Sequence, residues 1–194
     1  MKIIIITGPS GSGKTSLAKN LMLELENCHI ISTDDFYRTG RISNFLSKFI
    51  ESYFDREISL NNKLLRKTIN KILKNEEINY SYKYDFIKKR TKITYINSLS
   101  IKNLIIEGIF SLNLLKFIER NDYLVIRLQI NKEICMKRIK KRDHIERGKS
   151  EKKSLDEFIK AWNIYKENEK SYKISNEVKE LIFKNDPNIN TILK

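Results

Sequence analysis

The stretch GPSGSGKT, residues 8–15, decides the fold of this chain. It matches the pattern G-x-x-x-x-G-K-[ST], and it lies between an apolar run at residues 2–7 and a helical pattern at residues 14–26. Glycines allow the backbone to wrap around phosphate groups, and the first N–H groups of the following helix supply positive potential. The stretch therefore predicts a phosphate-binding loop, or P-loop, at a strand–helix junction.

Each part of this loop has an expected task. We expect Lys14 to reach the β- and γ-phosphates of ATP or GTP, and Thr15 to ligate Mg²⁺. The predicted nucleotide-binding residues of the loop are Gly8, Ser10, Gly11, Ser12, Gly13, Lys14, Thr15 and Ser16.

Apolar strands alternate with amphipathic helices along the rest of the chain. The expected strands are 29–33, 104–108, 123–128 and 178–183, and the expected helices are 41–53, 60–73, 131–142 and 154–169. This alternation predicts an α/β fold of the P-loop NTPase type, a parallel sheet with helices on both faces in a single domain over residues 1–194. In the segment 78–98, tyrosines alternate with polar residues, which predicts a small β-hairpin inserted at the edge of the sheet.

The composition excludes several classes of protein. No apolar run is long enough to span a bilayer, and residues 1–10 predict a buried strand rather than a signal peptide. With two cysteines and two histidines, neither a disulfide framework nor a zinc site follows, and we expect a cytoplasmic protein. The net charge of +14 suits an anionic partner such as a nucleotide, although we interpret most lysines as solvated surface residues.

Acidic residues follow two of the predicted strands. Asp34 and Asp35 lie in STDDFYR, residues 32–38, and Glu107 ends the strand LIIEG. Because parallel strands bring their carboxyl ends to one edge of the sheet, Asp34 and Glu107 should meet the phosphate loop there. Such carboxylates can orient Mg²⁺ or take a proton from an attacking hydroxyl. One aspartate of the pair is expected only to form a turn or a helix cap.

At this point the chain resembles the uridine kinase family, the uridine–cytidine kinases. The resemblance runs through most of the chain and rests on six stretches in the family's order. They are GPSGSGKTS (8–16), STDDFYR (32–38), YFDREISLNNKLL (53–65), YKYDFIKKR (82–90), IIEGIF (105–110) and RDHIERGK (142–149).

The resemblance implies transfer of the ATP γ-phosphate to the 5′-hydroxyl of uridine or cytidine, a reaction of pyrimidine salvage. It implies that Asp34 is the general base, that Asp55 holds the ribose hydroxyls and that Tyr84 contacts the substrate. The implied substrate-binding residues are Asp34, Tyr37, Asp55, Tyr84, Phe86 and Lys89, and the implied metal ligands are Thr15, Asp34 and Glu107.

The resemblance also implies a basic lid over residues 142–150. Arg142, Arg147 and Lys149 of this lid would close over the triphosphate, and the implied catalytic residues are Asp34, Lys14, Arg142 and Arg147. Family members are commonly tetramers, so a homo-oligomer, dimer or tetramer, is expected, with no nucleic-acid or membrane partner.

Two positions depart from the family pattern. Lys89 occupies the place of a histidine that reads the pyrimidine edge, and Ile139 stands where an arginine is expected. The first departure bears directly on base specificity.

Three alternatives remain open. One is a related kinase for a sugar phosphate, similar to phosphoribulokinase, in which Lys88, Lys89 and Arg90 would grip the substrate phosphate. Another is a non-enzymatic or regulatory nucleotide-binding module. The presence of Lys14, Asp34 and Glu107 together argues against it. The third is a nucleic-acid-binding protein, which the positive charge suggests but for which no reading module is recognisable.

Overall fold

The computed structural model describes residues 1–96, 100–118, 122–171 and 178–193, except for the side chains of Glu146, Arg147 and Ser171. The strands are β1 (Lys2–Thr7), β2 (Cys28–Ser32), β3 (Tyr80–Asp85), β4 (Arg90–Tyr95), β5 (Asn103–Glu107), β6 (Tyr123–Leu128) and β7 (Lys179–Phe183). The α-helices are α1 (Lys14–Glu24), α2 (Arg41–Phe49), α3 (Asn62–Leu73), α4 (Lys132–Arg147), α5 (Glu151–Ser171) and α6 (Ile189–Leu193). Short 3₁₀ helices are η1 (Thr33–Phe36), η2 (Tyr53–Asp55), η3 (Glu57–Ser59) and η4 (Ser111–Phe117).

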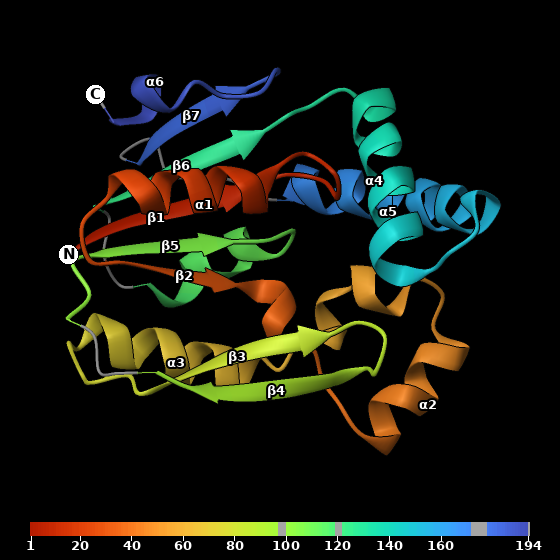
Figure 1. Ribbon diagram of the computed structural model, residues 1–194, viewed down its shortest axis with the longest axis horizontal. Coiled ribbons are helices and arrows are strands. Elements are labelled where there is room, and N and C mark those ends of the chain that lie inside the picture. The colour runs from red at the N-terminus through yellow and green to blue at the C-terminus, as the bar shows by residue number, and fades with distance from the viewer. Residues whose placement is uncertain (97–99, 119–121, 172–177, 194) are drawn as a thin grey trace.

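A five-stranded sheet has the order β2-β5-β1-β6-β7, and each pair of neighbours is parallel. The arrows of these strands point the same way in Figure 1, toward the side on which α4 and α5 lie. In the register of the sheet, Glu107 of β5 pairs with Ile6 of β1 and with Ser32 of β2. The ends of the first, second and fifth strands therefore meet at one edge, as predicted.

Helices cover both faces of this sheet because the strands are apolar on both sides. Ile3 and Ile5 of β1 pack in one cluster with Leu65 and Ile69 of α3, among other residues. Ile4 and Ile6 of the same strand point the other way, into a second cluster built on α1, α4 and α5. The continuous apolar run of this strand, residues 3–6, is thus explained by burial on both faces, and the predicted fold class is confirmed.

The predicted hairpin exists, but it does not extend the parallel sheet. β3 and β4 form a separate antiparallel sheet, which lies along α3 in Figure 1. The ring of Tyr82 packs on Phe36 of η1 with centroids 5.2 Å apart, so the hairpin is held by the segment that follows β2. Residues 97 and 98 of the predicted insertion lie outside the described residues.

The region of the predicted lid is largely helical. α4 runs to Arg147, five residues beyond the predicted end at 142, and α5 begins at Glu151. Gly148 adopts φ 60° and ψ 25°, the left-handed conformation that commonly ends a helix. In the described parts of the chain, none of the helices combines the length and the apolar character needed to cross a bilayer.

Candidate active site

The phosphate loop requires glycine at two close contacts. A Cβ atom on Gly8 would lie 2.7 Å from Ser12 Oγ, and one on Gly11 would lie 2.5 Å from the carbonyl oxygen of Cys135. The second contact shows that the loop is pressed against α4. At its start α1 has no capping side chain and no acidic residue in its first turn, so its N–H groups are suited to an anion.

Lys14 and Ser12 give this loop an inward polar lining. Nζ of Lys14 is buried and donates a hydrogen bond to the carbonyl of Pro9 at 2.9 Å. Burial lowers the pKa of Lys14, while the charges of Glu107 and Asp34 oppose that shift. The hydroxyl of Ser12 is buried and has no hydrogen-bond partner among the described residues. A buried cation beside an unpaired hydroxyl fits the phosphates of a nucleotide.

Thr15 and Glu107 meet at the ends of α1 and β5. The hydroxyl of Thr15 donates to Oε1 of Glu107 at 3.1 Å. Burial raises the pKa of Glu107, and the neighbouring charge of Asp34 raises it further, while Lys14 lowers it. A hydroxyl and two carboxylates are the hard oxygen ligands that Mg²⁺ prefers, so Thr15, Asp34 and Glu107 fit the predicted metal site.

The position of Asp34 depends on a glycine at the end of β5, the strand that pairs with β2 in the sheet. Gly108 follows Glu107 with φ +146°, and a Cβ there would overlap the hydroxyl of Thr33. Thr33 is fully buried and directly precedes Asp34 in η1. Only glycine lets η1 approach the end of β5 so closely, and this approach brings Asp34 beside Glu107.

The two aspartates of STDDFYR have different surroundings. Asp34 accepts a hydrogen bond from the hydroxyl of Tyr37 at 3.3 Å and lines the main cavity. Asp35 accepts the backbone N–H of Tyr84 at 3.0 Å and pairs with Lys83 at 3.3 Å. Burial raises the pKa of Asp35, and these two partners oppose the shift. Asp35 therefore ties the hairpin to η1, while Asp34 faces the cavity.

The main cavity has a volume of about 680 Å³. It is bounded by Ser10 of the phosphate loop, by the segment 50–55, by the hairpin and by α5. All of the predicted substrate-binding residues line it, namely Asp34, Tyr37, Asp55, Tyr84, Phe86 and Lys89. The structure thus brings together residues that lie as far apart in the sequence as 34 and 89.

Aromatic rings form one wall of this cavity. Tyr37 packs edge-on against Phe54 and Tyr84 with centroids 5.2 Å and 5.3 Å apart, and Phe86 lies 5.1 Å from Tyr84. The single hydroxyl proton of Tyr37 is shared between Asp34 and the carbonyl of Phe54, the latter at 2.9 Å, and these contacts fix its ring. Such a wall suits the face of a flat ring such as a nucleobase.

Lys89 ends the tight turn of the hairpin. It has φ +48°, and the turn is held by Asp85, whose carboxylate accepts the N–H groups of Ile87 and Lys88 at 3.0 Å and 2.8 Å. The side chain of Lys89 is exposed at the rim of the cavity. Its ammonium can therefore reach the cavity without a burial cost.

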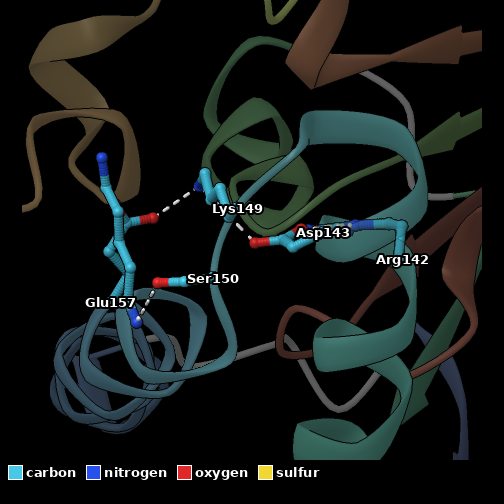
Figure 2. Close-up of polar contacts among 6 residues, drawn as sticks. Arg142, Asp143, Lys149, Ser150 and Glu157 are labelled. Carbon is cyan, nitrogen blue, oxygen red and sulfur yellow. Dashed lines mark hydrogen bonds and ion pairs between the residues drawn. The ribbon is translucent and has the colours of Figure 1, made fainter.

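Two of the three predicted lid cations also line the cavity. Arg142 donates from Nε and Nη2 to Oδ1 of Asp143 at 3.1 Å and 2.8 Å. Lys149 contacts Asp143 at 3.5 Å and Glu157 at 2.5 Å, and Figure 2 shows Lys149 between the carboxylate of Asp143, from α4, and that of Glu157, from α5. The side chain of the third cation, Arg147, lies outside the described residues.

Several cavity residues were not predicted from the sequence. Phe54 and Asp143 lie inside stretches that resemble the family, next to Asp55 and Arg142. Their place near the site could be predicted from the sequence, but their side-chain contacts could not. Glu157 and Lys153 come from α5, where no sequence signal separates them from other charged residues of a solvated helix. Ile139 is buried against the phosphate loop, which explains why this position cannot hold the expected arginine in this packing.

Comparisons with known proteins agree with this architecture. A family model described as "AAA domain" matches residues 4–160. The uridine kinase of Borrelia duttonii is 27% identical over 165 residues, which are 83% of this chain and 76% of that protein. The resemblance to the uridine kinase family is thereby confirmed.

Solved structures confirm the fold. YFH7 of Saccharomyces cerevisiae superposes with a TM-score of 0.73 at 10% identity, over 94% of this chain and 92% of that one. A structure described as a "possible uridine kinase" from Bacillus stearothermophilus gives a TM-score of 0.57 at 15% identity, over 94% and 88% of the two chains.

Proposed function

We propose that this chain, which belongs to the AAA domain family, is a nucleoside kinase that transfers the γ-phosphate of ATP or GTP to the 5′-hydroxyl of uridine. Its relatives make it a P-loop phosphotransferase with a nucleotide as phosphate donor and a small molecule as acceptor. We further propose that uridine is the preferred acceptor and cytidine a weaker one, and that the reaction belongs to cytoplasmic pyrimidine salvage.

One observation carries the proposal. A single cavity joins Ser10 of the phosphate loop and Asp34 to the aromatic wall formed around Tyr84 and Phe86. A nucleoside has the matching layout, because its base is flat, its ribose carries hydroxyl groups and its 5′-hydroxyl extends from one end. The volume of about 680 Å³ lies within the range of small-molecule sites.

The acceptor side of the reaction is assigned to residues of this cavity. Asp34 would take the proton of the 5′-hydroxyl, and the hydrogen bond from Tyr37 would hold its carboxylate in place. Asp55, at the end of η2, would accept hydrogen bonds from the ribose hydroxyls. Tyr84 and Phe86 would contact the base, and Lys89 would reach its polar edge.

The donor side is assigned to the phosphate loop and the basic segment. Lys14 would neutralise the β- and γ-phosphates, while Arg142 and Lys149 would stabilise charge on the transferring phosphoryl group. Arg147 is given the same role on sequence grounds alone. Mg²⁺, held by Thr15, Asp34 and Glu107, would supply charge neutralisation across the phosphate oxygens when bound.

A second candidate acceptor is a sugar phosphate. Lys89, Lys153 and Lys160 all line the same cavity, so it has cations that a nucleoside does not need. Lys160 already pairs with Glu51 at 2.7 Å, which weakens this reading. Lys88 and Arg90, both in the described part of the chain, do not line the cavity with Lys89, so the proposed phosphate clamp is incomplete.

A substrate screen tests the proposal. Purified protein with Mg²⁺ and either ATP or GTP is offered uridine, cytidine, purine nucleosides and sugar phosphates, and nucleoside diphosphate release is measured. Uridine should give the highest kcat/KM. The highest value for a sugar phosphate would establish the second candidate, and donor hydrolysis with no acceptor dependence would refute both.

The expected assembly and partners need their own measurements. By analogy with the family, a dimer or tetramer and no nucleic-acid or membrane partner are proposed. Light scattering after size exclusion checks the assembly. Gel retardation over a salt series checks nucleic acid, since binding through surface lysines would fall steeply with salt.

A further inference from the structure

We propose that Asp143 is a positioning residue that orients Arg142 and Lys149 toward the transferring phosphate, and that Glu157 holds Lys149 until the nucleotide phosphates displace it. The inference rests on the proposed function, because it assigns an anionic ligand to the two cations. Asp143 does not itself contact substrate in this account. It acts through its neighbours.

The carboxylate of Asp143 connects the two cations of the cavity. Its Oδ1 accepts two hydrogen bonds from Arg142, at 3.1 Å and 2.8 Å, and its Oδ2 contacts Nζ of Lys149 at 3.5 Å (Figure 2). Residues 142 and 143 are adjacent on a helix, where side chains normally diverge. The guanidinium of Arg142 must therefore bend back to make this contact, which selects one orientation from its many rotamers.

The backbone of Asp143 positions Lys149 as well. Its carbonyl oxygen accepts the N–H of Gly148 and the N–H of Lys149, the latter at 3.1 Å. This bond between residues six positions apart needs the left-handed conformation of Gly148. The chain thus turns back at the end of α4 and returns Lys149 to the carboxylate of the same residue.

Burial separates the two acidic partners. The side chain of Asp143 is 4% exposed, while that of Glu157 is 48% exposed. Without the carboxylate of Asp143, Arg142 and Lys149 would lie beside each other with no buried anion between them. Glu157, in contrast, can move into solvent at little cost. Asp143 is therefore the permanent partner and Glu157 the displaceable one.

Charge balance explains why displacement is expected. Arg142 and Lys149 pair with Asp143 and Glu157, so each of these two cations already has an anionic partner before any ligand enters. A triphosphate brings several negative charges to the same cavity and competes with Glu157 for Lys149. Part of the attraction between protein and nucleotide is consequently offset by the loss of the Lys149–Glu157 pair.

Glu157→Gln tests the displaceable pair. Calorimetric titration with MgATP, and separately with inorganic tripolyphosphate, should give a Kd about two- to fivefold lower than wild type, the span of an exposed ion pair. The gain should shrink as salt is raised. Glu151→Gln is the matched control, because Glu151 lies on the same helix as Glu157 and pairs with Lys140 of α4 at 3.4 Å but does not line the cavity. An unchanged Kd in Glu157→Gln, or an equal gain in the control, would overturn the role of Glu157.

Asp143→Asn tests the positioning role. It keeps the shape of the side chain but loses the charge that orients both cations, so kcat should fall at least tenfold with KM for the nucleoside within about threefold. Asp143→Glu should restore part of kcat, which a merely structural loss would not permit. Equal losses in Asn and Glu variants that melt at the wild-type temperature would overturn the inference.

The two levels of proposal fail in different ways. If wild type binds MgATP but phosphorylates no nucleoside, the proposed function fails while the Kd comparison still decides the role of Glu157. If wild type phosphorylates uridine and neither variant behaves as described, the inference about Asp143 and Glu157 fails and the proposed function stands.

Discussion

The hydroxyl of Thr15 donates a hydrogen bond to Glu107 over 3.1 Å, although 92 positions separate the two residues. The contact joins the start of α1, just after the phosphate loop, to the end of β5. Glu107 is only 3% exposed, and burial together with the charge of Asp34 raises the pKa of its carboxyl group. A carboxylate in this position destabilises the free protein, which is typical of a group kept for function.

Glu107→Gln should stabilise the protein and inactivate it. The pKa of Glu107 is raised above 4.5 in the folded state, so the folded state binds more protons than the unfolded state. The contribution of Glu107 to the free energy of unfolding therefore falls as the pH rises from the unfolded-state pKa to the folded-state pKa. The neutral amide removes this loss, so Tm at neutral pH should rise by roughly 2–4 °C, the shift for 1 kcal/mol in a chain of this size. Thermal melts from pH 4 to 8 check this, and a lower Tm for the variant at neutral pH would refute it.

Asp34→Asn and Asp35→Asn should have different effects. Loss of the base should lower kcat by about a hundredfold to ten-thousandfold while Kd for MgATP changes only several-fold. Asp35→Asn should chiefly loosen the hairpin, because Asp35 accepts the N–H of Tyr84 at 3.0 Å. Its KM for the nucleoside should rise more than its kcat falls. Steady-state kinetics decide, and the same kcat loss in both variants would contradict the assignment of Asp34.

Gly108→Ala should disrupt the site at a distance from the substrate. The added methyl group would overlap Thr33 and push η1, with Asp34, away from Glu107. The matched control is Gly40→Ala, because Gly40 also has a positive φ, +93°, but a Cβ there meets nothing within 4 Å. Both variants carry backbone strain, and the overlap with Thr33 adds to it in Gly108→Ala. Gly108→Ala should therefore lose more stability than Gly40→Ala, and it alone should lose at least tenfold in kcat. Equal kcat in the two variants would show that the approach of Thr33 is unimportant.

Lys89→His should narrow the preference for uridine over cytidine. An ammonium donates hydrogen bonds but accepts none, so it suits the O4 acceptor of uracil and faces the amino group of cytosine donor to donor. One such mismatch costs about 1–3 kcal/mol, or roughly tenfold to a hundredfold in kcat/KM. Histidine can donate or accept, and it tolerates the left-handed backbone at this position. Equal rates on both nucleosides in both proteins would remove Lys89 from the base site.

The sequence predicted most of the fold for local reasons. The phosphate loop combines a fixed spacing of glycines with Lys14 and Thr15, and the three central strands of the main sheet, β1, β5 and β6, contain apolar runs bounded by polar residues. Asp34 and Glu107 could be brought together because a parallel sheet places the ends of its strands at one edge. Those relations need no knowledge of side-chain packing.

What the sequence did not predict depends on contacts between elements. The last turns of α4 are rich in charged residues and have no apolar period, so the end of this helix was expected at residue 142 rather than at Arg147. The roles of Asp143 and Glu157 follow from the turn at Gly148, which sets α5 beside α4. The docking of the hairpin on η1 follows from Asp35 and Phe36, neither of which has a periodic signal.

Phosphoryl transfer from ATP to uridine, compared with transfer to 5′-deoxyuridine, tests the central claim most directly. The two acceptors share the base and the ribose 2′- and 3′-hydroxyls, so both should bind, and they differ only at the atom that Asp34 is proposed to deprotonate. Labelled γ-phosphate should appear in uridine 5′-monophosphate, with no labelled product from 5′-deoxyuridine and at least a hundredfold less product in Asp34→Asn. Equal labelling of the two acceptors, or labelling of a sugar phosphate and of neither nucleoside, would contradict the account.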